Sequence, residues 1–260
     1  MRPGDCIHLS QAHITDLEVE ALTRAVASGW VAPLGPEVDG FEGDICEFTG
    51  VGHALALASG TAAIHLALMA LGIKSGDEVI VPTLTFGATA FPVTYTGAKP
   101  VFLDVEERSW GLDPNVLESV LDERSQQGRR VAAVIPVDLF GRPADYDRIL
   151  PVAAEYDIPV LVDAAESLGA THHARAAGTV AQAGVYSFNG NKIMTTSGGG
   201  MLVSDDGELV EKARFWSTQS REPFPWYEHE EIGYNYRLSN ILAALGRAQL
   251  ARLPMTSSAS

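Results

Sequence analysis

One lysine, Lys192, stands in a short polar loop between an apolar stretch, residues 185–188, and a run of three glycines, residues 198–200. A lysine held partly out of water can present a neutral amine, which condenses with an aldehyde to form a Schiff base. An isolated loop lysine is far more often an ordinary surface residue. Whether Lys192 has a chemical role therefore depends on which residues lie around it.

The triplet Ser59-Gly60-Thr61 lies between an apolar stretch and a helical pattern that starts at once. Free amides at a helix N-terminus, a glycine that admits close approach and a threonine hydroxyl together form an anion site, for which phosphate is a natural guest. The alternative is an ordinary N-cap, since Ser and Thr cap many helices. Ser187, just before the lysine loop, is a candidate second phosphate donor, or else a strand hydroxyl satisfied by backbone.

Two further residues follow apolar stretches that read as strands. Asp163 ends the run 158–162, and ligands bind at the carboxyl ends of parallel strands. A protonated pyridine nitrogen would be a suitable partner for its carboxylate; an N-cap for the next turn is the alternative. Phe86 can stack on a flat ring, although many such residues belong to the core. Together with the lysine and the anion site, these residues describe a holder for pyridoxal phosphate.

Apolar strand patterns alternate with helical periodicity through most of the chain, which predicts βαβ crossovers. We expect a three-layer α/β/α fold with a mostly parallel sheet, in which 201–204 pairs with 185–188. The expected strands are 53–58, 78–81, 100–103, 131–136, 159–162, 185–188 and 201–204. The expected helices are 16–28, with a capping box at Thr15, then 38–48, 62–71, 87–95, 114–123, 144–156, 207–216 and 239–253.

The composition excludes several classes of protein. The 260 residues carry a net charge of −15, which argues against nucleic acid or an anionic membrane as the main partner. Neither a secretory leader nor an apolar run of membrane-spanning length is visible. Cys6 and Cys46 show no metal-ligand spacing, so we expect free thiols and a cytoplasmic protein.

Six segments are together specific enough to indicate a family. The chain resembles the DegT/DnrJ/EryC1/StrS sugar aminotransferases, which are fold type I pyridoxal-phosphate enzymes, from about residue 7 to about residue 253. The segments are SGTAAIHLAL (59–68), PTLTFGAT (82–89), PVDLFGRPAD (136–145), VDAAESLGA (162–170), YSFNGNK (186–192) and GYNYRLSNILAALG (233–246).

The resemblance implies a role for each matching residue. Lys192 would bind the cofactor aldehyde, Asp163 would pair with the pyridine nitrogen, and Phe86 would stack on the ring. Three residues would hold the phosphate: Gly60, Thr61 and Ser187.

Further residues would complete the site. Glu166 stands where many members have glutamine or histidine, and would lie near the cofactor's phenolic oxygen. Asn235 would reach the cofactor phosphate of the neighbouring subunit, and Arg237 the anionic group of the substrate. Shared sites of this kind imply a homodimer.

The implied reaction moves an amino group from glutamate to a nucleotide-linked 4-keto-6-deoxy sugar. A related branch performs 3-dehydration with histidine at the lysine position, and Lys192 argues against that reaction. A lyase-type reaction on an amino acid is a further alternative, which the sugar-family motifs disfavour.

The C-terminal end departs from the family pattern. We expect an N-terminal segment and helix (1–30), a cofactor-binding large domain (31–253) in which the C-terminal region starts near 233, and a disordered tail (254–260). Members continue into a small C-terminal domain that is largely missing here, so the chain reads as truncated. The alternative function is therefore a remnant that binds cofactor but is inactive, or an interaction protein.

Overall fold

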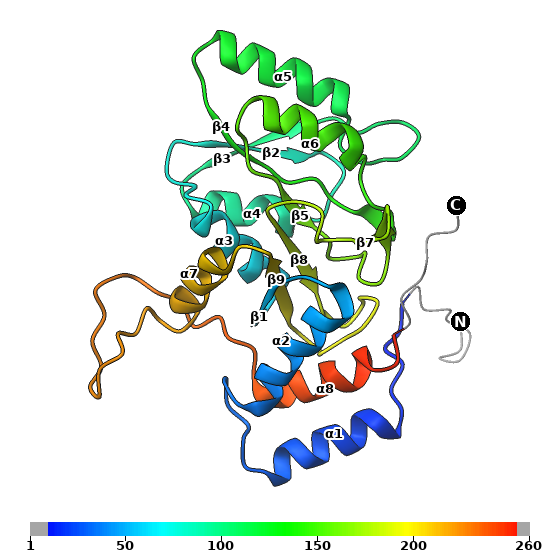
Figure 1. The fold of residues 1–260 in the computed structure, drawn as a ribbon, viewed down its shortest axis with the longest axis vertical. Coiled ribbons are helices and arrows are strands. Elements are labelled where there is room, and N and C mark those ends of the chain that lie inside the picture. The colour runs from blue at the N-terminus through cyan, green and yellow to red at the C-terminus, as the bar shows by residue number, and fades with distance from the viewer. Residues whose placement is uncertain (1–9, 254–260) are drawn as a thin grey trace, which may run out of the picture.

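The computed structural model describes residues 10–253, which form a sandwich with helices on both faces of a central sheet (Figure 1). The long helices are α1 (Asp16–Ala27), α2 (Pro36–Thr49), α3 (Gly60–Ala70), α4 (Gly87–Tyr95), α5 (Pro114–Gln126), α6 (Tyr146–Glu155), α7 (Gly207–Ser217) and α8 (Asn240–Leu250). The sheet strands are β1 (His53–Leu57), β2 (Glu78–Pro82), β3 (Lys99–Leu103), β4 (Val131–Val134), β5 (Leu161–Asp163), β8 (Ala183–Ser187) and β9 (Gly200–Ser204).

The sheet consists of two hydrogen-bonded parts. Strands β3, β2 and β4 are parallel neighbours in that order, and β5 pairs in parallel with β8. Parallel bridges from Val134 to Val160 and from Val137 to Asp163 connect the two parts. Strand β9 runs antiparallel between β8 and β1. The predicted pairing of the segments on either side of the lysine loop is thereby confirmed.

Alternate residues of the central strands pack on opposite faces of the sheet, as strand geometry requires. In β8, Val185 joins a cluster with residues of α3, α4 and α7. Tyr186 joins a second cluster with residues of α2, α5, α6 and α8. In this second cluster the rings of Phe41 and Phe188 lie 5.1 Å apart. Burial on both faces explains why the strands read as continuous apolar runs.

Helix α1 packs outside this sandwich, against α8 (Figure 1). The predicted capping box is present, with Thr15 and Glu18 satisfying each other's backbone amides. The buried Glu18 carboxylate also accepts hydrogen bonds from Gln249 and Arg252, each at 2.7 Å. Burial raises the pKa of Glu18, but the hydrogen bonds from Thr15 outweigh it and bring the pKa to about 2.

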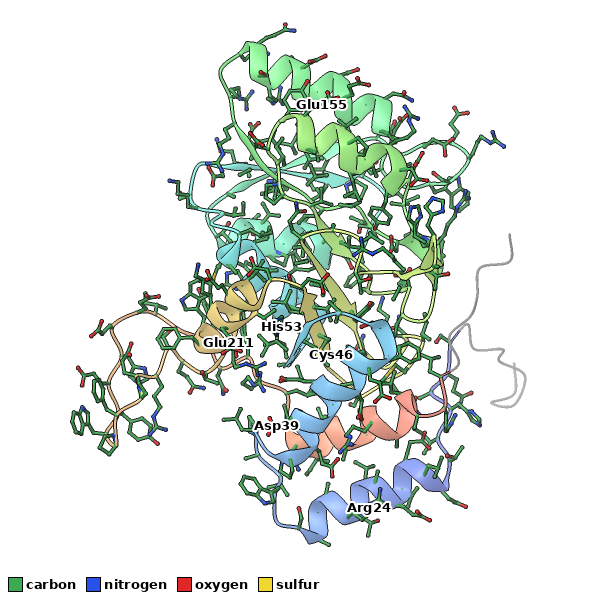
Figure 2. All side chains as sticks on the ribbon, in the orientation of Figure 1. Arg24, Asp39, Cys46, His53, Glu155 and Glu211 are labelled. Atoms are coloured by element: carbon green, nitrogen blue, oxygen red, sulfur yellow. The ribbon has the colours of Figure 1, made fainter. Side chains whose placement is uncertain are left out.

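Part of the segment between α7 and α8 projects from the body, and the side chains of that part stand away from the rest of the molecule (Figure 2). Phe224 and Trp226 stack with their ring centroids 5.2 Å apart. The segment then returns along β1, where Arg237 forms an antiparallel bridge with Leu57. It thus covers the free edge of β1 next to the start of α3.

The predicted alternation of strands and helices is confirmed. The predicted elements differ from the observed ones at their ends. Helix α3 begins at Gly60 rather than residue 62, because Ser59 caps it. Strand β4 ends two residues before the predicted 136, and α8 ends at Leu250 rather than residue 253. The sequence patterns missed the two-residue strands β6 (Thr171–His172) and β7 (Arg175–Ala176) and the 3-10 turn η1 (Leu139–Gly141).

In residues 10–253, no helix has the length and apolar character needed to cross a membrane. Cys46 is a half-buried free thiol. The predictions about Cys6 and about the tail at 254–260 lie outside the described residues.

Candidate active site

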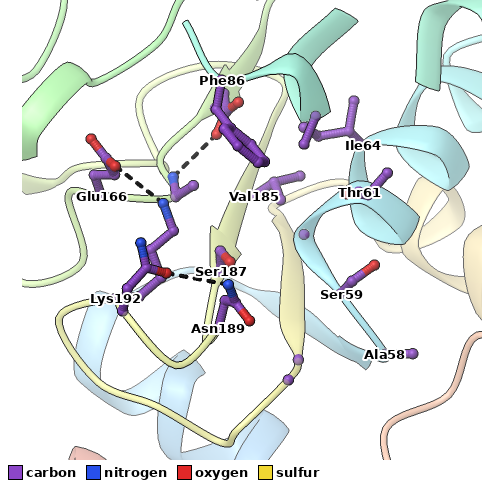
Figure 3. A pocket seen from close by; sticks show the side chains of 17 residues that line it. Ala58, Ser59, Thr61, Ile64, Phe86, Glu166, Val185, Ser187, Asn189 and Lys192 are labelled. Carbon is purple, nitrogen blue, oxygen red and sulfur yellow. Dashed lines mark hydrogen bonds and ion pairs between the residues drawn. The ribbon is translucent and has the colours of Figure 1, made fainter. Parts of the chain in front are cut away.

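A cavity of about 460 Å³ opens where β5 and β8 end and α3 begins (Figure 3). The structure brings seven of the predicted site residues to its wall. They are Gly60, Thr61, Phe86, Asp163, Glu166, Ser187 and Lys192. The carboxyl ends of parallel strands thus form the site, as expected for an open α/β sheet.

Lys192 reaches into this cavity from the loop that joins β8 to β9. Two backbone hydrogen bonds close the base of the loop, from Phe188 N to Gly199 O and from Thr196 N to Phe188 O, each 2.9 Å long. The side chain of Lys192 is only 14% exposed, and its Nζ lies 3.1 Å from Glu166 Oε1. The ion pair with Glu166 therefore fixes the position of the Lys192 amine in the cavity.

Asp163 is a buried carboxylate at the end of β5. Thr89 Oγ1 donates a 2.6 Å hydrogen bond to Oδ2, and the Ala165 amide donates to Oδ1 at 3.2 Å. Burial raises the pKa of Asp163, while the Thr89 hydrogen bond and the charge of Lys192 act in the opposite direction. A cation placed in the cavity would stabilise the ionised form further.

Glu166 connects the lysine to the turn η1. Its Oε2 accepts a 2.9 Å hydrogen bond from the Phe140 amide, while Oε1 faces Lys192. Phe140 has a φ of 54°, in the left-handed region that non-glycine residues seldom adopt. Backbone strain of this kind is common beside functional sites.

The start of α3 and the start of β9 lie in very close contact. Ser59 caps the helix by accepting a 3.0 Å hydrogen bond from Ala62 N. A methyl group at Gly60 would lie 3.2 Å from Ser187 Cβ, and one at Gly200 would lie 2.4 Å from Gly60 N. The first amides of a helix have no partner inside it, so this glycine-lined terminus with the Thr61 and Ser187 hydroxyls beside it fits a phosphate.

Phe86 precedes α4, and its ring reaches into the cavity (Figure 3). The side chain is 79% exposed, so the alternative of a core phenylalanine is wrong. An exposed ring at the mouth of a polar cavity is free to stack on a flat ligand.

Asn235 and Arg237 do not line this cavity. They line a second one of about 620 Å³, together with Thr218, Gln219 and Phe224. Arg237 is buried and forms a 2.9 Å ion pair with Glu42, while its Nε and Nη1 atoms have no partner among the described residues. Burial lowers the pKa of Arg237.

The sequence analysis did not single out three residues that the structure adds to the site. Thr89 binds Asp163, and Asn189 and Asn191 line the cavity. Thr89 lies in the first turn of the helix after Phe86, within a segment noted for its resemblance, but a hydroxyl in a helix gives no pattern that marks it as part of the site. The two asparagines lie on either side of Gly190, in the loop just before Lys192.

This architecture is that of fold type I, the class of pyridoxal-phosphate-dependent aminotransferases. Within the class, the chain belongs to the DegT/DnrJ/EryC1/StrS aminotransferase family, which it matches over residues 12–259. The donor set described above, with a lysine, a buried carboxylate and a helix terminus around one cavity, fits the cofactor of that class.

Three similar proteins illustrate the relationship. The putative pyridoxal phosphate-dependent aminotransferase EpsN of Bacillus subtilis is 50% identical over 244 residues, 94% of this chain and 63% of that protein. GDP-perosamine synthase of Caulobacter vibrioides is 42% identical over 236 residues, 91% of this chain and 62% of that protein.

A solved structure, a DegT DnrJ EryC1 StrS aminotransferase from Brucella abortus, superposes with a TM-score of 0.87 at 37% identity. This comparison covers 92% of this chain and 64% of that one. The chain therefore spans 62–64% of the length of these three relatives.

Proposed function

We propose that the chain is an aminotransferase that uses pyridoxal phosphate to move an amino group from glutamate to a nucleotide-linked 4-keto-6-deoxy sugar. The observation that carries the proposal is that Lys192, Asp163 and the glycine-lined start of α3 line one cavity. The sugar substrate is supported by similarity to GDP-perosamine synthase. The amino donor rests on the resemblance to the family.

When bound, pyridoxal phosphate supplies an aldehyde and an electron-accepting ring. In the proposal, Lys192 would hold the aldehyde when the cofactor is bound, and its Nζ atom would act as the base that moves the proton of the donor's α-carbon. Asp163 keeps the ring nitrogen protonated, and Phe86 covers one face of the ring.

The remaining residues of the cavity position the cofactor. Gly60, Thr61 and Ser187 bind the phosphate at the start of α3. Glu166, which accepts a 3.1 Å hydrogen bond from Lys192 Nζ, would lie near the phenolic oxygen of the bound cofactor.

We propose a homodimer, because Asn235 and Arg237 lie in a separate cavity. Asn235 would reach the cofactor phosphate of the neighbouring subunit, and Arg237 would bind the anionic part of the substrate. The cytoplasm is the proposed location, because we expect both cysteines to be free thiols, which are typical of a reducing compartment.

The direct test is the Lys192→Ala variant. We expect the wild-type protein to show the visible absorbance of covalently bound cofactor, and the variant to lose it together with about 10²-fold or more of the activity. Lys212→Ala on α7 is the matched control and keeps both. A wild-type protein that takes up no cofactor would overturn the proposal.

The second candidate is a protein of the same family that binds the cofactor but is inactive. Glutamate alone separates the two candidates. Release of 2-oxoglutarate with loss of the cofactor's colour supports the transferase, and cofactor that binds but does not react supports the second candidate.

A further inference from the structure

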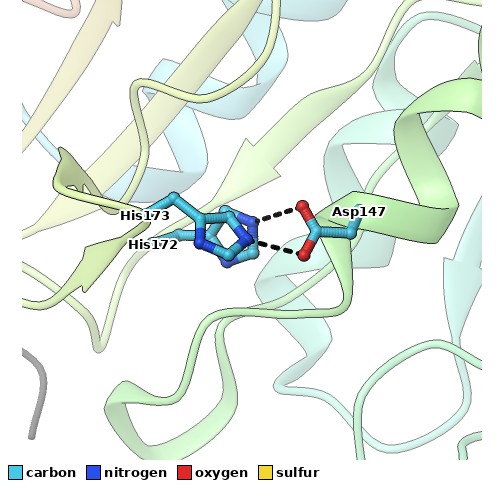
Figure 4. Close-up of side chains that lie close together, drawn as sticks. All are labelled: Asp147, His172 and His173. Atoms are coloured by element: carbon cyan, nitrogen blue, oxygen red, sulfur yellow. Dashed lines mark hydrogen bonds and ion pairs between the residues drawn. The ribbon is translucent and has the colours of Figure 1, made fainter. Parts of the chain in front are cut away.

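Asp147, His172 and His173 form a cluster at the surface, and none of the three lines the lysine cavity (Figure 4). Asp147 lies in the first turn of α6, and the two histidines belong to the hairpin of β6 and β7. The Nε2 atoms of His172 and His173 lie 3.2 Å and 2.7 Å from the two carboxylate oxygens of Asp147. Each residue thus offers one potential metal ligand to the same point.

The hairpin turn explains why neighbouring histidines face the same carboxylate. Successive side chains of a strand point to opposite faces, so two adjacent histidines in a strand would diverge. Here His173 and Ala174 form the turn, with φ values of 46° and 65°. Such values are uncommon for residues other than glycine, and they swing the His173 ring to within 4.4 Å of the His172 ring.

Packing holds His172 in place, whereas the exposed side chains of His173 and Asp147 can adjust their positions. The ring of His172 contacts the buried Tyr146 edge to face, with centroids 5.6 Å apart, and its side chain is 20% exposed. The His173 and Asp147 side chains are 72% and 60% exposed. One packed ligand and two exposed ones can adjust to an ion at little cost in packing.

We propose that these three side chains form a binding site for a divalent cation of the zinc type. Zinc binds imidazole nitrogen and carboxylate oxygen at about 2.0–2.2 Å, so ligand atoms in a tetrahedral site lie about 3.3 Å apart. The ligand atoms of the cluster all lie within 4.8 Å of one another, so small rotations of His173 bring them to that spacing. Water completes the shell, as in zinc sites with three protein ligands.

The ion would replace the hydrogens that point from the histidine Nε2 atoms to the carboxylate, because a metal-bound imidazole offers a lone pair there. Binding would therefore link the hairpin to α6. The hairpin follows the segment that carries Asp163 and Glu166, so the link would stabilise a region next to the lysine cavity without contributing to it.

The experiment is a titration of tag-free, chelator-treated holoprotein with zinc alone, in competition with a chromophoric zinc indicator. We expect one saturable site in the wild type. Asp147→Asn, which keeps the shape of the side chain, and His173→Ala should each weaken zinc binding about tenfold or more. His229→Ala, at an exposed histidine outside the cluster, is the matched control and should bind like the wild type.

Two further measurements complete the test. Zinc should raise the unfolding temperature of the wild type and not that of His173→Ala, while cofactor absorbance stays unchanged in every variant. Equal zinc affinity in the wild type and in both cluster variants would overturn the proposal. The absence of saturable zinc binding in the wild type would also overturn the proposal. In that case the cluster would only connect the hairpin to α6 by hydrogen bonds.

Discussion

Asp163 has a protonation state that depends on its neighbours in the cavity. Burial raises the pKa of this carboxyl group, and Thr89 opposes the shift by donating a hydrogen bond of 2.6 Å. The proposed role needs the ionised form, which pairs with a protonated ring nitrogen. Thr89 is therefore a positioning residue that also favours the required charge.

Thr89→Val should move the acidic limb of the pH profile to higher pH. Loss of the hydrogen bond raises the pKa of Asp163 further, so the carboxylate becomes protonated at a higher pH as the solution is acidified. The measurement is cofactor affinity and kcat/KM as a function of pH. Thr94→Val on the same helix, where the hydroxyl binds Phe91 O, is the control. An unchanged acidic limb would remove Thr89 from this role.

Several residues chosen from the sequence do lie in the lysine cavity, because each ends or follows an apolar strand in the chain, and their binding of the cofactor stays a prediction. Strand ends of a parallel sheet meet at one edge, so Asp163 and Ser187 had to be close. Thr89 was not predicted, since a hydroxyl in a helix gives no pattern of its own. Its contact with Asp163 depends on how α4 sits over the sheet, which is a property of packing.

At the scale of elements, the start of α3 depends on the adjacent strand β9. The space around Gly200 is filled by backbone, namely Gly60 N and the carbonyl carbon of Ser59. Flexible side chains can move away from an added methyl group, but a helix terminus and a sheet strand cannot do so cheaply. The position of the amides that we propose to bind the phosphate is thus set by the packing of two backbones.

Gly200→Ala should lower the free energy of unfolding by about 1–3 kcal/mol and weaken cofactor binding. The added Cβ would lie 2.4 Å from Gly60 N, so the start of α3 must shift. Urea unfolding and cofactor titration measure the two effects. Gly43→Ala in α2 is the control, because nothing lies within 4 Å of its added Cβ. A Gly200 variant as stable as this control would contradict the packing argument.

Element type was predictable because the strands are buried on both faces and the helices carry regular apolar spacing. The hairpin of β6 and β7 was not, since two residues per strand are too few to show alternation. Its turn, His173-Ala174, also lacks the Asn-Gly or Asp-Gly signal that such hairpins usually carry. The pattern therefore missed the element that holds two histidines beside Asp147.

For the whole molecule, the main feature is the separation of the proposed site residues into two cavities. Lys192 and Asp163 line one, and Asn235 and Arg237 line the other. A two-fold dimer can bring different patches of two identical chains together at each of two sites. The proposed homodimer would unite the two groups in this way.

Mixed dimers test this arrangement. Lys192→Ala removes the lysine of its own cavity, and Asn235→Asp places a negative charge against the phosphate of the neighbouring subunit. A dimer with one chain of each kind keeps one intact site, so co-refolding equal amounts should restore roughly a quarter of the wild-type activity. Asn235 is exposed, so the change should not disturb folding. A mixture no more active than its separate components would show that the sites are not shared.

The backbone hydrogen bonds at the base of the lysine loop separate the reach of the Lys192 side chain from the register of the strands below it. The bonds from Phe188 N to Gly199 O and from Thr196 N to Phe188 O fix where the loop leaves the sheet and where it returns. How far the amine extends is then decided by the few residues in between. Lengthening or shortening that span would change the reach of Lys192 while the strand register below stays intact.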